Sequence, residues 1–260
     1  MPALMPNVKR KVVTFDLWQW HWRGIYGNHQ HPYNDHSLQP SSISRKLYQV
    51  NLGPPETFGK ARWVVSSGGL LFEQRVKSQP SIALGEARVT SLDLEGLTMV
   101  ISETQDDFLG ISFSFQSSSR FYVLMWKRTS ESYTSGGYST FGDAGVHLKR
   151  IMSGSGPSTR LETALFETNS TAGHTELLWH HPFPWSPGMA YRWKILHRPL
   201  IGVIRVSIGL GSTPLVDSGN IYNDVLRGGR FGPFCQFLND TIWADVKFRA
   251  NETRASTSEI

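Results

Sequence analysis

The sequence has one cysteine, Cys235, in 260 residues. A single cysteine excludes an internal disulfide and any zinc site built from several thiolates. The sequence also lacks an unbroken run of about 18 apolar residues, the length that a membrane-spanning helix requires. The first twenty residues contain no apolar stretch as long as that of a signal peptide. We therefore expect no membrane insertion, no internal cross-link and no secretion signal in the sequence as printed.

Charged residues are also scarce, at 18%, and long segments of helix-forming residues are missing. Aromatic residues reach 12%, with nine Trp, beside 24 Gly and 14 Pro. Flat aromatic side chains fill the space between packed sheets, while Gly and Pro form turns. The net charge of +5 is scattered, with one basic run at 9–11, so we expect no nucleic-acid partner. The composition predicts an all-β protein.

From Lys46 onward, short apolar segments alternate with turns, a pattern typical of a β-sandwich. In Phe108 to Gln116 the alternation places Ile111, Phe113 and Phe115 on one side of a strand. The continuous apolar run that follows predicts a central strand covered on both faces. The predicted strands cover residues 62–65, 70–74, 89–103, 108–116, 120–128, 146–152, 191–197, 203–208, 231–238 and 242–248.

The segment before this pattern is different in character. Residues 1–45 contain closely spaced Trp and His without periodicity and end in a polar run typical of a linker. We predict a poorly ordered N-terminal segment at 1–45, one β-sandwich at 46–253 and a flexible tail at 254–260.

Two groups of carboxylates are candidates for chemistry. Asp106 and Asp107 lie in a turn between predicted strands, and Asp93 and Glu95 are two residues apart on one strand face. Calcium prefers six to eight oxygen ligands, and carboxylates with turn carbonyls supply them. A glycoside hydrolase also needs two carboxylates, across a sugar-binding cleft. Solvated acids and ion pairs explain the same residues, so spacing alone leaves the three alternatives open.

Enzyme motifs are missing from the sequence. There is no G-x-S-x-G nucleophile elbow and no phosphate-binding glycine loop, which argues against catalysis. His180 and His181 have no patterned third ligand and are expected at the surface. Three N-x-[ST] sequons begin at Asn169, Asn239 and Asn251, and the second lies at a predicted hairpin tip.

Residues Gln116 to Lys127 read QSSSRFYVLMWK and resemble the C-terminal domain of the thrombospondin family, whose cell-binding segment differs only at Leu124. Further motifs follow in family order over about 46–253: Trp63-Val64-Val65, Leu92-Asp93-Leu94-Glu95-Gly96, Asp106-Asp107-Phe108, Tyr191-Arg192-Trp193, His197-Arg198-Pro199, Asp217-Ser218-Gly219 and Arg227-Gly228-Gly229-Arg230.

The resemblance implies a concanavalin-like jelly-roll β-sandwich of two antiparallel sheets, placed outside the cell. It implies bound calcium, with Asp106 and Asp107 as ligands and Asp93, Glu95 and Asp217 as further candidates. It assigns receptor binding to Arg120, Phe121, Tyr122, Val123, Leu124, Met125, Trp126 and Lys127. Expected partners are cell-surface receptors and matrix proteins or glycosaminoglycans. The sequence has no coiled coil, so no oligomerisation element is expected within it.

The favoured interpretation is a non-enzymatic, calcium-binding module for cell adhesion and matrix contact. One alternative is a glycan-binding lectin, in which exposed Trp179, Trp185 or Trp193 stacks on a sugar ring. A less favoured alternative is a glycoside hydrolase that uses Asp93 and Glu95.

Overall fold

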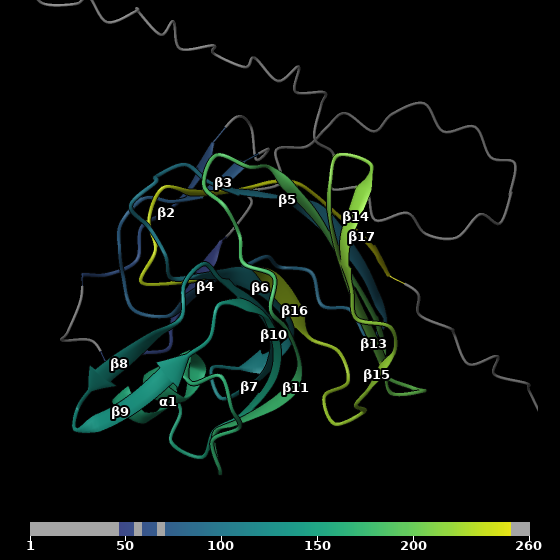
Figure 1. The fold of residues 1–260 in the computed structure, drawn as a ribbon. Coiled ribbons are helices and arrows are strands. Elements are labelled where there is room, and N and C mark those ends of the chain that lie inside the picture. The colour runs from purple at the N-terminus through teal and green to yellow at the C-terminus, as the bar shows by residue number, and fades with distance from the viewer. Residues whose placement is uncertain (1–46, 55–58, 67–70, 251–260) are drawn as a thin grey trace, which may run out of the picture.

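A computed structural model describes residues 47–54, 59–66 and 71–250, which form seventeen strands and one short helix (Figure 1). The expectations for residues 1–45 and 254–260 therefore lie outside the described residues. In this part of the chain, no helix is long and apolar enough to cross a membrane.

The strands form two antiparallel sheets, as predicted for a jelly roll. The seven-stranded sheet has the order β1 (Tyr48–Asn51), β4 (Ser81–Leu84), β16 (Arg230–Gln236), β6 (Phe108–Ser117), β7 (Arg120–Lys127), β10 (Gly145–Met152) and β11 (Thr175–His181). The other sheet has the order β14 (Thr213–Asp217), β13 (Val203–Leu210), β12 (Tyr191–Arg198), β5 (Leu92–Val100), β17 (Thr241–Ala250), β3 (Leu71–Gln74) and β2 (Trp63–Ser66), with β15 (Ile221–Tyr222) also paired to β13. All ten predicted strands are present within a few residues of their expected bounds.

Consecutive strands repeatedly change sheets, as in β4–β5–β6 and β16–β17. The predicted hairpin tip at Asn239 is therefore wrong, because β16 and β17 belong to different sheets and the residue lies in the crossover between them. A crossover and a hairpin have the same local signature, an apolar strand followed by polar turn residues and a second apolar strand.

Between the sheets lies a core rich in tryptophan. Trp243 is fully buried and donates a hydrogen bond from Nε1 to the carbonyl of Gly110 at 3.1 Å. Gly110 is required by the close approach of β7, because a Cβ there would lie 2.0 Å from the Leu124 carbonyl oxygen. The indole of Trp126 likewise donates to the Phe183 carbonyl at 2.6 Å. The indole N–H groups of Trp243 and Trp126 thus have the partners that burial demands, whereas Nε1 of the buried Trp193 has none among the described residues.

A second apolar cluster covers the outer face of the seven-stranded sheet. There α1 (Thr159–Phe166) and the hairpin of β8 (Glu131–Ser135) and β9 (Tyr138–Gly142) lie against β6 and β7 (Figure 1). Side chains of β7 alternate between the two clusters, with Leu124 in the inter-sheet core and Val123 under the helix. The prediction of a central strand covered on both faces is confirmed.

The helix was not expected from sequence, because its apolar content is spread over only eight residues. Ser158 caps its N-terminus by accepting a hydrogen bond from the Leu161 amide at 3.1 Å. The fully buried Lys149 of β10 donates to three backbone carbonyls at the C-terminal end of α1, including that of Leu165 at 2.8 Å. A cation is stabilised there by the helix dipole.

One side-chain assignment in β6 is also corrected. Ile111 and Phe113 share the inter-sheet core as expected, but Phe115 belongs to the outer cluster. The pairing of β6 with β7 shifts register between Phe113 and Ser117, and Ser114 adopts a left-handed φ of 48°. An irregularity of this kind reverses the faces of the residues that follow it, and simple alternation does not reveal it.

Candidate functional site: an acidic edge beside a buried lysine

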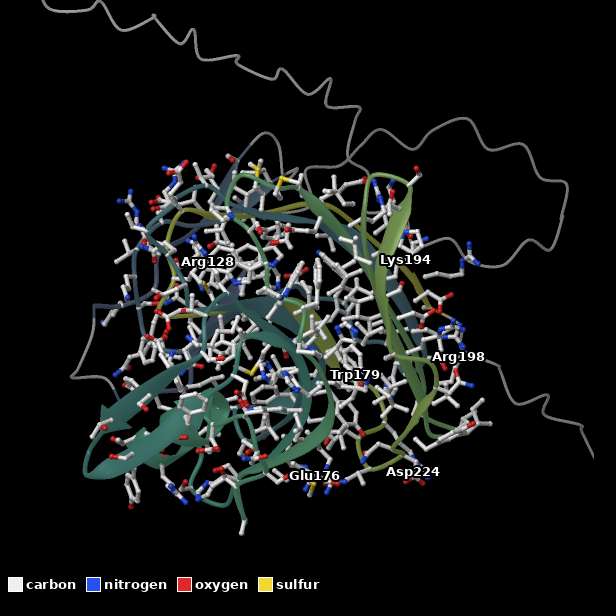
Figure 2. All side chains as sticks on the ribbon, viewed as in Figure 1. Arg128, Glu176, Trp179, Lys194, Arg198 and Asp224 are labelled. Carbon is white, nitrogen blue, oxygen red and sulfur yellow. The ribbon has the colours of Figure 1, made fainter. Side chains whose placement is uncertain are left out.

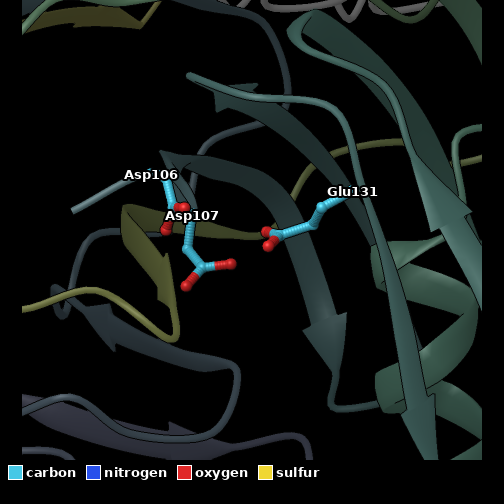
Figure 3. A group of neighbouring side chains, drawn as sticks. All are labelled: Asp106, Asp107 and Glu131. Atoms are coloured by element: carbon cyan, nitrogen blue, oxygen red, sulfur yellow. The ribbon is translucent and has the colours of Figure 1, made fainter. Parts of the chain in front are cut away.

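Three carboxylates meet where β6, β7 and β8 come together. Asp106 and Asp107 immediately precede β6, Lys127 ends β7, and Glu131 begins β8. Ligand oxygens of Asp106, Asp107 and Glu131 all lie within 4.8 Å of one another. Figure 3 shows Glu131 reaching toward Asp107 from the opposite side of the group. We call these three residues the acidic edge.

The ammonium group of Lys127 lies inside this group. Its side chain is completely buried, and Nζ bonds both to Asp107 Oδ1 at 3.2 Å and to the Glu131 carboxylate. The same ammonium lies 5.0 Å from the ring centre of Phe108 and 4.6 Å from that of Phe166. Two carboxylates and two aromatic faces thus compensate the loss of water around the charge.

Asp107 is the most perturbed carboxylate of the acidic edge. Its burial raises its pKa to about 6, because an ionised carboxylate loses hydration there. Lys127 and Lys77, the latter 3.3 Å from Oδ2, act in the opposite direction and favour the charged form. Glu131 and Asp106 add to the increase through like-charge repulsion. The site therefore holds an ionised Asp107 at neutral pH only with the help of neighbouring cations.

Backbone carbonyls around the acidic edge already have partners. The Arg128 guanidinium donates to the carbonyls of Glu103 and Gln105 at 2.7 and 3.0 Å, and its amide donates to Asp106. The buried Trp185 indole donates to the Asp107 carbonyl at 3.1 Å. These bonds hold the turn before β6 in one conformation.

The donor set fits a calcium ion in kind, because the carboxylates are hard oxygen ligands gathered in one place. Asp106 is the most available of them, with a long contact of 3.4 Å from the Thr129 hydroxyl to Oδ2. The lysines compete for the other two, because Lys127 contacts Asp107 and Glu131 and Lys77 contacts Asp107. The three carboxylates together exceed these two ammonium groups by one negative charge. A bound cation would have to share Asp107 and Glu131 with Lys127.

The other carboxylates from the sequence analysis lie on the eight-stranded sheet, each in an ion pair. Asp93 binds Arg198, Glu95 binds Lys194 at 3.2 Å, and Asp217 binds Arg205. Figure 2 shows Lys194 and Arg198 on the outer side of this sheet. Among the described residues, none of the three carboxylates joins a group of metal-ligating side chains. The structure brings Asp106 and Asp107 together and keeps the rest apart.

The segment Arg120–Lys127 forms strand β7, with β6 and β10 on either side. Arg120 is exposed, and every residue from Phe121 to Lys127 is buried. A partner that binds the folded domain can therefore reach Arg120 but not the seven side chains after it.

The expectation of exposed tryptophans is wrong for Trp185 and Trp193, which are 1% and 2% exposed. Both pack in the inter-sheet core, since their strands and loops present apolar faces to it. Trp179 is partly buried and packs against the same core. Of the three tryptophans that the lectin alternative proposed for stacking on a sugar ring, only Trp179 therefore remains a candidate.

The sequons have different settings. Asn169 is exposed after α1, and Asn239 is half-buried with its amide bonded to Asp240 at 2.7 Å. Asn251 lies outside the described residues.

The sequence analysis missed two members of the site. It did not identify Glu131 as a third carboxylate, and it did not identify Lys127 as the cation that pairs with the carboxylates. A signal was present, because Glu131 follows Lys127 by four residues at the end of a predicted strand. Without the register of β6 against β7, nothing indicated that the pair faces Asp107.

The fold and the acidic edge define a lectin-like jelly-roll module with three clustered carboxylates at the end of a loop. Residues 59–252 match the family model described as the thrombospondin C-terminal region, and the chain belongs to this family. Human thrombospondin-3 is 39% identical over 215 residues, covering 80% of this chain and 22% of that protein. Bovine cartilage oligomeric matrix protein is 37% identical over 194 residues, covering 74% of this chain and 26% of that protein.

The chain thus spans about a quarter or less of the length of these curated relatives. Among solved structures, the exoplasmic/lumenal domain of VIP36, in its Ca²⁺/Man3GlcNAc-bound form, matches with a TM-score of 0.50 and 7% identity. That match covers 79% of this chain and 90% of the VIP36 chain. At this identity the likeness supports the fold alone.

Proposed function

We propose that this chain is a non-enzymatic, calcium-binding module of thrombospondin type that contacts cell-surface receptors and matrix components outside the cell. Membership in the thrombospondin C-terminal family supports the extracellular role, and one relative is itself named as a matrix protein. The observation that carries the calcium proposal is the acidic edge, where three carboxylates lie within 4.8 Å.

The ion pairs of Asp93 and Glu95 favour a non-enzymatic role. Arg198 and Lys194 hold these carboxylates in ion pairs on the solvent-facing side of the sheet. A general acid in a glycoside hydrolase instead needs a raised pKa, and its partner lies across a cleft. A carboxylate beside a cation is a poor proton donor for that reaction.

Calcium should raise the thermal unfolding midpoint, and replacing Asp106→Asn should remove about half of this rise. Binding to the native state alone stabilises by about 2.7 kcal/mol at a hundredfold excess over Kd. Loss of one charged ligand should weaken calcium binding by about tenfold. The measurement is differential scanning fluorimetry in calcium, in magnesium and in chelator, with isothermal titration for the affinity.

Asp93→Asn is the matched control, because it also removes one carboxylate but lies on the other sheet beside Arg198. It should leave the calcium-induced shift unchanged. A full calcium shift in Asp106→Asn, or its loss in Asp93→Asn alone, would overturn the proposed site.

A further inference from the structure

Two neighbouring loops at one end of the eight-stranded sheet expose large apolar side chains. Leu200 and Ile201 lie in the turn between β12 and β13 and are 70% and 69% exposed, and Tyr222 of β15 is 72% exposed. These are the three most exposed large apolar residues in the part of the chain that the structure describes. The hollow between the two loops, of about 350 Å³, is lined by Leu200, Ile201, Gly202, Tyr222, Asn223 and Asp224, which we call the apolar tip.

Hydrogen bonds hold both loops of the apolar tip in place. The Ile201 amide donates to the Arg198 carbonyl at 3.2 Å and closes the turn, and the Asn223 amide donates to the Gly202 carbonyl at 2.6 Å and joins the two loops. The buried Tyr122 donates from its hydroxyl to Asn223 Oδ1 at 2.5 Å. Strand β15 also pairs with β13 (Figure 1). The three apolar side chains are thus presented to solvent on backbone that is fixed to the domain, as in an interaction site.

Positive charge adjoins the apolar tip. Arg227 contacts Asp224, the one carboxylate of the tip, at 3.4 Å, and it also lines a second hollow together with Arg88 and Gln116. Arg120 donates to the amide oxygen of Gln116 at 3.4 Å. Arg88 and Arg120 are exposed, and neither has a carboxylate partner among the described residues. Three guanidinium groups therefore accompany a single carboxylate on this side of the molecule.

We propose that the apolar tip and these three arginines form a peripheral binding surface for a lipid bilayer that carries anionic headgroups. Aliphatic side chains at a loop end can enter the boundary between headgroups and acyl chains, and a tyrosine ring is favourable at that depth. Guanidinium groups beside the point of entry pair with lipid phosphates. The contact needs no spanning segment, because only side chains enter the bilayer.

The charge distribution favours this occupant. An apolar protein surface would cover the tip but would leave the three arginines without anions, whereas an anionic bilayer satisfies both parts of the surface at once. The surface shares no residue with the acidic edge, so the proposal is independent of calcium binding there.

The first test is cosedimentation of the purified chain with vesicles of phosphatidylcholine, alone or mixed with phosphatidylserine. The parent chain should bind the mixed vesicles, and higher salt should weaken this binding. Replacing Leu200→Ser and Ile201→Ser together should weaken it at least about tenfold. Arg88→Ala and Arg227→Ala should each weaken it about fivefold. All four side chains are exposed, so the variants should keep the parental unfolding midpoint.

Ile101→Ser and Arg192→Ala are the matched controls. His197 of β12 pairs with Leu92 at the start of β5, so the apolar tip lies beyond the start of β5, whereas Ile101 follows its end. At about 3.3 Å per strand residue, both control positions lie roughly 20 Å or more from the tip. Ile101 is 53% exposed, and Arg192 has a single carboxylate partner, as Arg227 has. Each control should change the affinity less than about twofold.

A fluorescent label gives a direct readout of insertion. The only cysteine of the sequence, Cys235, is buried, so a thiol-reactive dye should label Leu200→Cys selectively. The emission of an environment-sensitive dye at this position should shift to shorter wavelength on the mixed vesicles. The same dye on Ile101→Cys should show no shift.

An absence of vesicle binding would overturn the proposal, as would equal weakening by the tip variants and the controls. Binding that depends on the arginines but not on Leu200 and Ile201 would mean attraction to charge alone and would reject the apolar tip. Self-association of the parent chain that the double serine variant abolishes, without vesicle binding, would assign the tip to a second copy.

All measurements are repeated in chelator, where vesicle binding should persist. Loss of binding in chelator would assign the lipid contact to calcium at the acidic edge and would overturn the role of the tip. Failure of the calcium proposal instead shows in the unfolding midpoint, so the two failures are distinguishable.

Discussion

Replacing Lys127→Met should destabilise the domain by about 3–5 kcal/mol, the cost of removing one partner from a buried ion pair. The methionine keeps the apolar stem over Phe108 and Phe166 but leaves the Asp107 carboxylate buried without its nearest cation. Urea unfolding followed by tryptophan fluorescence measures the loss. Because the variant has lost its internal cation, calcium should stabilise it more than it stabilises the parent chain.

Two further variants make this prediction specific. Lys194→Met removes a lysine that is 60% exposed and paired with Glu95, so it should cost less than about 0.5 kcal/mol. Adding Asp107→Asn to Lys127→Met should recover part of the loss, because the uncompensated charge is then removed. A loss below about 1 kcal/mol in Lys127→Met would show that water reaches Asp107 in solution.

Acidification from pH 7 to 5 should remove about 2 kcal/mol of stability through His147, and His147→Leu should abolish that loss. Burial lowers the pKa of this imidazole to about 2, with Lys149, His180 and Lys127 adding repulsion. The folded pKa lies below the unfolded value of about 6.5. The contribution of neutral His147 to the free energy of unfolding is therefore complete above pH 6.5 and is lost as the pH falls toward 2.

Other groups titrate in the same range, so the comparison is between variant and parent at each pH. Burial also lowers the pKa of His197 to about 4, and this residue adds a loss of the same sign. Asp107 has the opposite sign, because its folded pKa of about 6 exceeds its unfolded value, and its contribution to stability decreases as the pH rises. Urea midpoints at pH 7 and pH 5 isolate His147. An equal drop in parent and His147→Leu would contradict a neutral, buried imidazole.

His147 produces this loss of stability on acidification because its imidazole is enclosed by the protein. It is fully buried, its ring stacks on His180 at 4.6 Å, and neither ring nitrogen has a hydrogen-bond partner within the described residues. At pH 7 the leucine variant should be at least as stable as the parent, since it removes two polar atoms without partners.

Strand positions could be predicted from the sequence because they depend on local alternation. The run after Arg120 indicated a strand covered on both faces, and β7 has such a place between β6 and β10. Cys235 lies in an apolar stretch of the sequence, Phe234 to Phe237, and it is 1% exposed on β16. Burial raises the pKa of this thiol, which keeps it protonated and unreactive.

The misplaced features share a physical cause. The crossover at Asn239, the reversed face of Phe115 and the buried Trp185 all depend on which strand packs against which. Local periodicity contains no information on sheet membership, and a single irregularity inverts every side chain beyond it.

The sequence by itself determined the all-β class, the two-sheet jelly roll through its family motifs, and the pair Asp106 and Asp107 at a turn between strands. Only the tertiary structure decided what surrounds those carboxylates. The register of β6 against β7 places the Lys127 ammonium at Asp107, twenty residues away along the chain, and the β8 hairpin brings Glu131. The physical reason is that burial and ion pairing are properties of packed neighbours, whereas alternation and turn chemistry are properties of adjacent residues.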